Sequence, residues 1–361
     1  MQDIYNITTH QEFESAALEL FREQAVRCEP YCEYLRLIGC EATQVVAVEQ
    51  IPFLPIELFK SHKIYCEQTP PEVIFTSSGA VSSRHYMRSL AEYEAAFTAA
   101  FRYYYGDVRG WSIYALLPSY LEREGSSLIY MCERLRSLSG GGGGFYLYDH
   151  QRLIEDMRRD PRRKILLGVT YALLDLAESG LVSEPLCEPL NETLCEALNK
   201  PLSKPLSKPL NKPLSKPLSK PLSKPLSKPL SKTIIMETGG MKGRREELPR
   251  EELHRRLCRA FGVDVIHSEF GMAELTSQGY SQGGGVFSVP PWMGVLVRDL
   301  SDPFALSRVG RGGLNIIDLA SRGSCGFIET QDMGRIGEDG LFTIDGRIEG
   351  SDIRGCNLLI E

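Results

Sequence analysis

The stretch HSEFGMAEL, residues 267–275, brings together an aromatic ring, a glycine and two carboxylates. Glu269 and Glu274 flank Phe270 and Gly271. An ordinary core strand is not expected to carry a glutamate near both ends of so short a run, because burying a carboxylate costs free energy. The pattern favours a turn that presents a flat ring and a carboxylate to one ligand. His267 is expected to be packed or hydrogen-bonded rather than to act as a base.

A hydroxyl-rich loop follows the expected strand VIFT and reads TSSGAVSSRH, residues 76–85. Its residues Ser77, Ser78 and Gly79 offer hydroxyl and backbone N–H groups that can surround phosphates, and Arg84 adds positive charge. A plain turn is the other interpretation, because serine and glycine are common turn residues. The loop is not a P-loop, since no GxxxxGK[ST] pattern occurs in the chain.

Further strand ends carry residues suited to a flat, hydroxylated ligand. The segment METGG ends in Gly239 and Gly240, and paired glycines let the backbone approach a planar ring closely, although a tight turn into a helix is equally compatible. Asp332, in FIETQDMGR, and Arg347, in FTIDGR, also lie at expected strand ends. An aspartate there can bind two ribose hydroxyls, and an arginine can contact ribose or phosphate.

Composition and missing motifs exclude several classes of protein. The chain has no GxSxG or HExxH pattern, no GxGxxG after a strand, and no metal-spaced pair among its six histidines. No apolar run of about 18 residues predicts a membrane helix, and the N-terminus lacks the features of a secretory signal. Ten cysteines without a pairing pattern then favour reduced thiols in a cytoplasmic protein. The acidic net charge of −6 argues against a nucleic-acid surface.

Residues 185–232 form a low-complexity segment dominated by the tetrad PLSK. A proline at every fourth position removes helix hydrogen bonds, and a period of four gives polyproline II no apolar face. The segment is therefore expected to be a solvated, basic insertion rather than part of a core. Both of its flanks look structured, which predicts one domain built from residues 1–184 and 233–345, followed by a tail at 346–361.

Apolar periodicity predicts the elements of that domain. Helical spacing covers residues 10–38, residues 87–104 and the amphipathic stretch before Gly262, whereas short apolar runs predict strands at WSIYALL, KILLGV, TIIMET and DVIHSEF. The glycine run at 140–144 is expected to be a flexible linker. Helices alternating with strands predict an α/β core with a mostly parallel sheet, and the last quarter predicts a more antiparallel, β-rich subregion.

The order of these segments resembles that of the adenylate-forming superfamily, and more specifically that of the LuxE-like acyl-protein synthetases. The resemblance rests on IPFLPIELFKS, LLPSYLEREGSSLIYM, ILLGVTYALLDLA, METGGMKGRREEL, HSEFGMAELTSQGYS, PPWM, IIDLA and SDIRGCNL, which are spread over nearly all of the chain outside 185–232. It implies the α/β fold of the superfamily's N-terminal domain. Since the sequence ends at Glu361, it also implies that the small C-terminal lid domain is absent or reduced.

The resemblance implies an ATP and Mg²⁺ site and a role for each candidate residue. Phe270 would stack on adenine beside Gly271, and Glu274 would coordinate the Mg²⁺ bound to ATP. Asp332 would hold the ribose hydroxyls, and Arg347 would contact ribose or the α-phosphate. The remaining candidates fall into two groups: Ser77, Ser78, Gly79 and Arg84 around the phosphates, and Gly239 and Gly240 along the adenine and acyl pocket.

The implied reaction joins a fatty or other carboxylic acid to AMP and then passes the acyl group to a thiol. Cys356, in RGCNLLIE, stands where the family carries its acyl-accepting cysteine, and a partner protein, reductase-like or a carrier, would receive the group next. Ala80 and Ala273 stand where the superfamily usually has threonine. A ligase that uses CoA directly and a degenerate nucleotide-binding scaffold therefore stay open as alternatives.

Overall fold

The computed structural model describes residues 3–77, 81–117, 125–182, 233–241, 244–246 and 248–348. The predictions for Ser78, Gly79 and Cys356, for the repeat at 185–232 and for most of the tail lie outside these residues. None of the described helices is long and apolar enough to cross a membrane.

Helices form where the sequence combines helical periodicity with a capping residue. The Thr9 hydroxyl accepts a hydrogen bond from the Glu12 backbone N–H at 3.2 Å, and the Glu12 carboxylate accepts one from the Thr9 N–H at 3.0 Å. Later in the chain, Gly262 ends a helix in the left-handed conformation, with φ of +63°. The described helices are α1 (His10–Arg27), α2 (Glu29–Leu37), α3 (Leu58–Ser61), α4 (Leu90–Tyr105), α6 (Ser127–Leu138), α7 (His150–Arg159), α8 (Thr170–Glu178) and α10 (Arg250–Phe261), with short 3₁₀ turns at η1 (Ile4–Asn6), η2 (Ala42–Gln44), η3 (Val48–Gln50) and η4 (Val108–Gly110).

The described strands belong to one large sheet and one two-stranded ribbon. They are β1 (Leu54–Pro55), β2 (Val73–Thr76), β3 (Arg84–Met87), β4 (Trp111–Leu116), β5 (Gly143–Phe145), β6 (Arg163–Val169), β7 (Thr233–Thr238), β8 (His267–Phe270), β9 (Gly279–Ser281), β10 (Val286–Ser288), β11 (Met293–Arg298), β12 (Leu306–Ser307), β13 (Gly310–Asp318), β14 (Phe327–Ile336) and β15 (Phe342–Arg347). The large sheet has the order β12-β11-β13-β14-β15-β10-β9-β8-β7-β6-β4-β5, with β1 beside β14, and β2 pairs with β3 in the ribbon.

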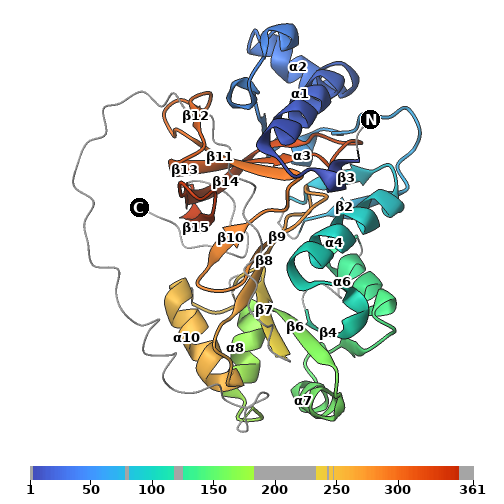
Figure 1. The fold of residues 1–361 in the computed structure, drawn as a ribbon, viewed down its shortest axis with the longest axis vertical. Coiled ribbons are helices and arrows are strands. Elements are labelled where there is room, and N and C mark those ends of the chain that lie inside the picture. Colours follow the sequence, from blue (N-terminus) through green and yellow to red (C-terminus); the bar gives the residue numbers. More distant parts are fainter. Residues whose placement is uncertain are drawn as a thin grey trace, which may run out of the picture.

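The large sheet has a parallel half and an antiparallel half, which meet at β8. Strands β5, β4, β6, β7 and β8 pair in parallel, whereas the pairings from β8 through β9 to β12 are antiparallel. This arrangement confirms the α/β class and the β-rich C-terminal subregion. Figure 1 shows α4 and α6 on one side of the parallel strands and α8 and α10 on the other. Covering both faces explains why β4 and β7 are buried along their whole length.

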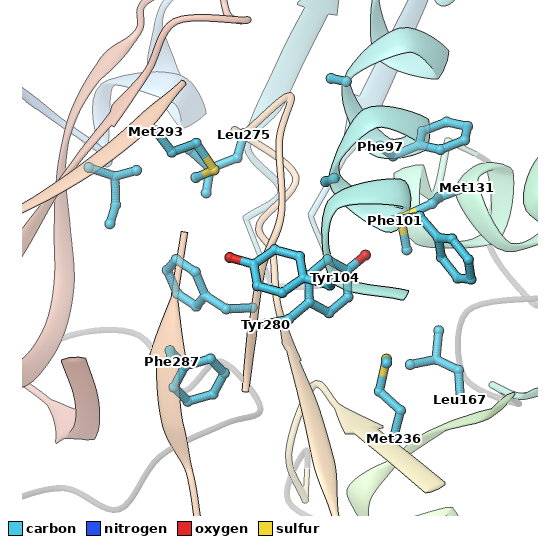
Figure 2. Close-up of a cluster of buried hydrophobic side chains, with 14 of the residues drawn as sticks. Phe97, Phe101, Tyr104, Met131, Leu167, Met236, Leu275, Tyr280, Phe287 and Met293 are labelled. Atoms are coloured by element: carbon cyan, nitrogen blue, oxygen red, sulfur yellow. The ribbon is translucent and has the colours of Figure 1, made fainter. Parts of the chain in front are cut away.

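Side chains from distant parts of the sequence tie the two halves together. The ring of Phe21, on α1, packs against Phe327 of β14 with 5.9 Å between ring centroids. Near the junction of the halves, Tyr280 of β9 packs on Tyr104 of α4, with centroids 5.0 Å apart (Figure 2). The junction is therefore a rigid, aromatic-rich part of the core, suited to holding a site at fixed geometry.

The glycine run at 140–144 is not a linker, contrary to the prediction from sequence. Gly143–Phe145 forms the edge strand β5, which pairs in parallel with Ile113–Ala115 of β4. A side chain at Gly143 would overlap the Ile113 carbonyl oxygen. Glycine here allows two backbones to approach closely, a use that composition alone does not distinguish from flexibility.

The described elements on either side of the repeat segment belong to neighbouring parallel strands. β6 leads into α8, and the next described residue after Val182 is Thr233, the first residue of β7, which pairs with β6 and with β8. Because a parallel crossover helix returns the chain to the edge where the next strand begins, we propose that the segment is an insertion inside this unit.

We expect a chain in which Val182 is joined to Thr233 by a short Gly/Ser linker to fold as the full chain does. Val182 and Thr233 are 6% and 1% exposed, so both ends are already anchored in the core. Shortening a flexible connection changes the free energy of unfolding by only about 1–2 kcal/mol. Thermal unfolding of the two proteins checks this, and loss of soluble folding in the shortened chain would show that the repeat packs on the body.

Candidate functional site

The structure explains the order of residues in HSEFGMAEL. β8 confirms the strand predicted at DVIHSEF, and it carries the buried Glu269, which is not expected of an ordinary core strand. Glu269 Oε2 accepts a hydrogen bond from the Thr238 hydroxyl at 2.6 Å, and Oε1 lies against Gly271, in the space that a side chain at that position would fill. A side chain at position 271 would therefore require the Glu269 carboxylate to move. The chain then turns and brings Glu274 back to the same site.

Glu274 is fully buried and is connected to the hydroxyl-rich loop. The Ser83 hydroxyl donates a hydrogen bond to Glu274 Oε1. The Ser83 backbone N–H donates to Ser77 Oγ at 2.9 Å, and the Ser77 N–H donates to the Ser83 carbonyl at 3.2 Å. The two ends of the loop are thus fastened to each other and to the carboxylate of the neighbouring turn.

Asp332 and Arg347 face each other across the antiparallel pair β14 and β15. Arg347 Nε lies 4.0 Å from Asp332 Oδ1, and the guanidinium donates a hydrogen bond to Gln331 Oε1. Arg347 is only 7% exposed, so its orientation is fixed by these neighbours. The antiparallel half of the sheet therefore places a carboxylate and a cation side by side.

These groups line one cavity at the junction of the two halves of the sheet. Its walls include seven of the residues that the sequence singled out: Ser77, Gly239, Phe270, Gly271, Glu274, Asp332 and Arg347. They come from four segments that are distant in sequence, namely the loop after β2, the end of β7, the turn after β8 and the pair β14 and β15. A single ligand with aromatic, hydroxyl and anionic parts can contact all of them at once.

Other sequence candidates lie away from this cavity or outside the described residues. Arg84 is exposed at the start of β3 and does not line the cavity. Gly240 is buried beside Gly239, and both glycines have positive φ, of +63° and +71°. Gly239 alone of the two reaches the cavity wall. Ser78, Gly79 and Cys356 belong to the segments that the structure does not describe.

No protein-family model and no curated protein matches the sequence. A solved structure of 2-hydroxyisobutyryl-CoA ligase in the postadenylation state with 2-HIB-AMP aligns with a TM-score of 0.61 and 13% identity, over 98% of this chain and 72% of that one. The same ligase in an open conformation, with 2-HIB-AMP and CoA, gives 0.59 and 13%, over 95% and 76%. This chain has the fold of an adenylate-forming ligase. It also aligns with ATP-bound MatB from Rhodopseudomonas palustris at a TM-score of 0.47 and 14% identity, over 76% of this chain and 47% of that one, so it spans about half of MatB.

The cavity also has polar lining residues that sequence reasoning did not select. Glu237 and Arg250 line the cavity together with Glu269 and Gln278. Arg250 Nη1 lies 3.3 Å from Glu237 Oε1, which also accepts a hydrogen bond from the Ser268 hydroxyl at 2.7 Å. The sequence offered one signal for this group, a glutamate inside the apolar run TIIMET. Its partners could not be predicted, because they come from a different strand and from α10.

The two buried glutamates have opposite electrostatic surroundings. Burial raises the pKa of Glu269 to about 7, and the charge of Glu237 adds to this effect. Burial acts on Glu237 too, but His254 and Arg250 beside it outweigh the burial and lower the pKa of Glu237 to about 2. Burial also lowers the pKa of His267 to about 4, so this histidine is packed and neutral, as the sequence predicts.

We expect Glu269→Gln to stabilise the protein at alkaline pH and to change little near pH 5. The folded-state pKa of Glu269, about 7, lies above the ordinary value of 4.5, so stability falls as pH rises from 4.5 to 7 and the full cost persists above 7. A glutamine cannot ionise and avoids this cost, which amounts to about 3 kcal/mol. Chemical unfolding of both proteins at about pH 5 and pH 8 measures the difference.

Glu237→Gln is the matched control, because its sign is opposite. The lowered pKa of Glu237, about 2, means that its contribution to stability is present above pH 4.5 and is lost as pH falls from 4.5 to 2. This variant should therefore be less stable than wild type at pH 8. We infer that the folded protein favours a neutral Glu269 and an ionised Glu237. An equal loss of stability in both variants at pH 8 would contradict this difference.

The residues present also fit a nucleotide-bound Mg²⁺ ion. Among the described residues, no group of three or more His, Cys, Asp or Glu side chains forms a metal site by itself. Glu274 supplies a single carboxylate beside the hydroxyl-rich loop. Mg²⁺ commonly binds through one or two carboxylates together with substrate phosphates and water, and one carboxylate next to a phosphate loop suits that mode.

Proposed function

We propose that this protein uses ATP to adenylate a carboxylic acid and then transfers the acyl group to a cysteine thiol. One observation carries the proposal: Ser77, Phe270, Glu274, Asp332 and Arg347 line a single cavity in a chain with an adenylate-forming fold. An aromatic ring, a carboxylate near hydroxyls, and an aspartate beside an arginine match the base, the metal-bound phosphates and the ribose of one ATP molecule.

Each residue has one role in this proposal. Phe270 stacks on adenine, and Gly239 lets the end of β7 approach the flat base. Asp332 accepts hydrogen bonds from the ribose hydroxyls, and Arg347 supplies a permanent positive charge near the ribose and the α-phosphate. Ser77 begins the loop around the phosphates. Glu274 holds Mg²⁺, which when bound offsets negative charge on the phosphate oxygens.

The first step forms an acyl adenylate. An oxygen of the substrate carboxylate attacks the α-phosphorus of ATP, and the bond between that phosphorus and the pyrophosphate oxygen breaks. Arg347 is fixed in place before the reaction, so it stabilises the charge that grows on the α-phosphate without reorganising. The product is a mixed anhydride with AMP as a good leaving group.

In the second step a thiolate attacks the acyl carbon, and the bond from that carbon to AMP breaks, giving a thioester and AMP. Cys356 is the proposed acceptor, with a fatty or other acyl group as cargo and a reductase-like or carrier protein as the next recipient. Direct transfer to CoA is the second candidate, because the ligase whose fold this chain shares was solved with 2-HIB-AMP and CoA.

Two measurements test the proposal. Carboxylate-dependent ATP–pyrophosphate exchange reports the first step, and a hydroxylamine-labile acyl label on the protein reports the second. Cys356→Ser should keep the exchange and lose the label. Cys325→Ser is the control, because Cys325 is fully buried before β14 and burial raises the pKa of its thiol well above the usual value.

The alternatives give different results in the same assays. A label that persists in Cys356→Ser and disappears in Cys325→Ser would make Cys325 the acceptor. Formation of acyl-CoA without any protein label would favour the CoA ligase. Absence of exchange with every acid and with Mg²⁺ and ATP present would favour a nucleotide-binding scaffold without this activity.

A further inference from the structure

One wall of the cavity is polar, and β7, β8 and α10 build it. Glu237, Thr238, Arg250 and Glu269 all line this wall. Glu237 is fully satisfied, because its carboxylate accepts hydrogen bonds from Thr170 at 3.0 Å and from Ser268 at 2.7 Å and pairs with Arg250. A buried carboxylate with so many partners is a structural group.

Glu269 differs from Glu237 in what surrounds its carboxyl. Within the part of the chain that the structure describes, Thr238 alone donates a hydrogen bond to it, at Oε2. Oε1 lies over Gly271 at the cavity wall, and the residue is only 9% exposed. A carboxyl oxygen at a cavity wall that no described protein group donates to can form a hydrogen bond with a group on a bound ligand.

This carboxyl lies beside the residues assigned to adenine, at a place where other side chains also line the cavity. Glu269 precedes the adenine-stacking Phe270 on β8, and its side chain folds back over Gly271. The neighbouring wall is formed by Tyr93 of α4 and by Leu128 and Met131 of α6. The Tyr93 hydroxyl already donates to the Ser127 carbonyl at 3.1 Å. Glu269 is thus a polar group of a cavity that also has an aromatic and apolar lining from α4 and α6.

We propose that Glu269 recognises a neutral hydrogen-bonding group, a hydroxyl or a carbonyl, on the acid substrate. The inference rests on the proposed adenylation and names the substrate class of that site. The cavity then selects hydroxy or oxo acids over plain alkyl acids, which narrows the fatty or other carboxylic acid that the sequence resemblance implies. A protonated Glu269 donates to a carbonyl, and an ionised one accepts from a hydroxyl. Thr238 acts as a positioning residue that holds Oε2 and aims Oε1.

A matched set of acids tests this proposal in the full chain. We would measure kcat/KM in pyrophosphate exchange with pentanoate, each of its monohydroxy derivatives and 4-oxopentanoate, all of the same chain length. Wild type should favour at least one oxygenated acid over pentanoate by about tenfold or more. Glu269→Leu should abolish or reverse this ratio, because an alkyl side chain leaves the substrate oxygen without a partner. Glu269→Gln should keep part of it, since an amide both donates and accepts.

Several outcomes would overturn the proposal. Equal kcat/KM values for pentanoate and all oxygenated acids in wild type would do so, as would an equal loss with every acid in Glu269→Leu, which indicates a purely structural role. If Glu269→Leu does not fold, Thr238→Val must lower the preference at least about threefold, since it removes the hydroxyl that holds Oε2.

A binding measurement distinguishes failure of the proposed adenylation from failure of recognition by Glu269. If no acid supports exchange, adenylation is wrong, and the carboxyl is then judged by thermal unfolding with 4-oxopentanoate or a hydroxypentanoate alone. A larger Tm increase in wild type than in Glu269→Leu supports recognition by Glu269. Equal increases, or none, in the two proteins overturn it.

Discussion

Glu274→Gln is expected to slow carboxylate-dependent ATP–pyrophosphate exchange by about 10²–10³-fold, the usual loss when one well-placed charge-stabilising contact is removed. Glutamine has nearly the same shape and keeps an oxygen that can accept the hydrogen bond from the Ser83 hydroxyl. The change therefore removes the negative charge without opening a cavity. Thermal unfolding should show a folded protein, so the loss reports on Mg²⁺ and ATP rather than on folding.

Two comparisons make this result specific to Glu274. Glu251→Gln, on the exposed face of α10, should leave exchange unchanged. Ser83→Ala should cause a smaller loss, because it removes only the donor that orients Glu274 Oε1. Raising the Mg²⁺ concentration should restore part of the activity of Glu274→Gln. Exchange close to the wild-type rate in Glu274→Gln would remove this residue from the site.

Several cavity residues could be singled out from the sequence by their unusual local chemistry, although Asp332, predicted at a strand end, lies inside β14. Gly239 after TIIMET, Phe270 before Gly271, and Asp332 within a β-rich segment each departed from the pattern of a packed strand. Such departures survive in a linear sequence, since they depend on residue type and on the neighbouring turn. The alternation of helices and apolar runs similarly predicted the α/β class and the antiparallel end of the sheet.

Partners that meet only through the fold were not predictable in this way. Glu237 and Arg250 are 13 positions apart, on a strand and a helix whose packing no local pattern specifies. The strand at DVIHSEF was predicted, but the hydrogen bond from Thr238 of the neighbouring strand to Glu269 within it was not. The glycines of β5 show the same limit, because close packing of backbones and flexibility use the same residue.

Asp318, to which the sequence analysis assigned no role, holds the chain that follows Glu274 in place. Its Oδ2 accepts hydrogen bonds from the backbone N–H groups of Thr276 at 2.9 Å and Ser277 at 2.8 Å. Its Oδ1 accepts from the Ser277 hydroxyl at 2.8 Å and from the Ala320 N–H at 3.1 Å. Asp318 is completely buried at the end of β13, so one carboxylate connects the antiparallel half of the sheet to the turn at the cavity.

Asp318→Asn is expected to lower the free energy of unfolding by about 3–5 kcal/mol, because the new amide places N–H groups against existing donors in a buried site. The fraction that remains folded should also lose exchange activity, since the segment carrying Glu274 is no longer fixed.

Asp299→Asn is the matched control. Asp299 accepts backbone N–H groups from Ser301 at 2.7 Å and Asp302 at 3.2 Å after β11, but it is exposed, and its loss should cost less than about 1 kcal/mol. Equal destabilisation by the two substitutions, measured by chemical unfolding, would show that burial of the Asp318 carboxylate is not what makes it important. If Asp318→Asn keeps wild-type exchange under conditions where it is folded, Asp318 stabilises the core without positioning Glu274.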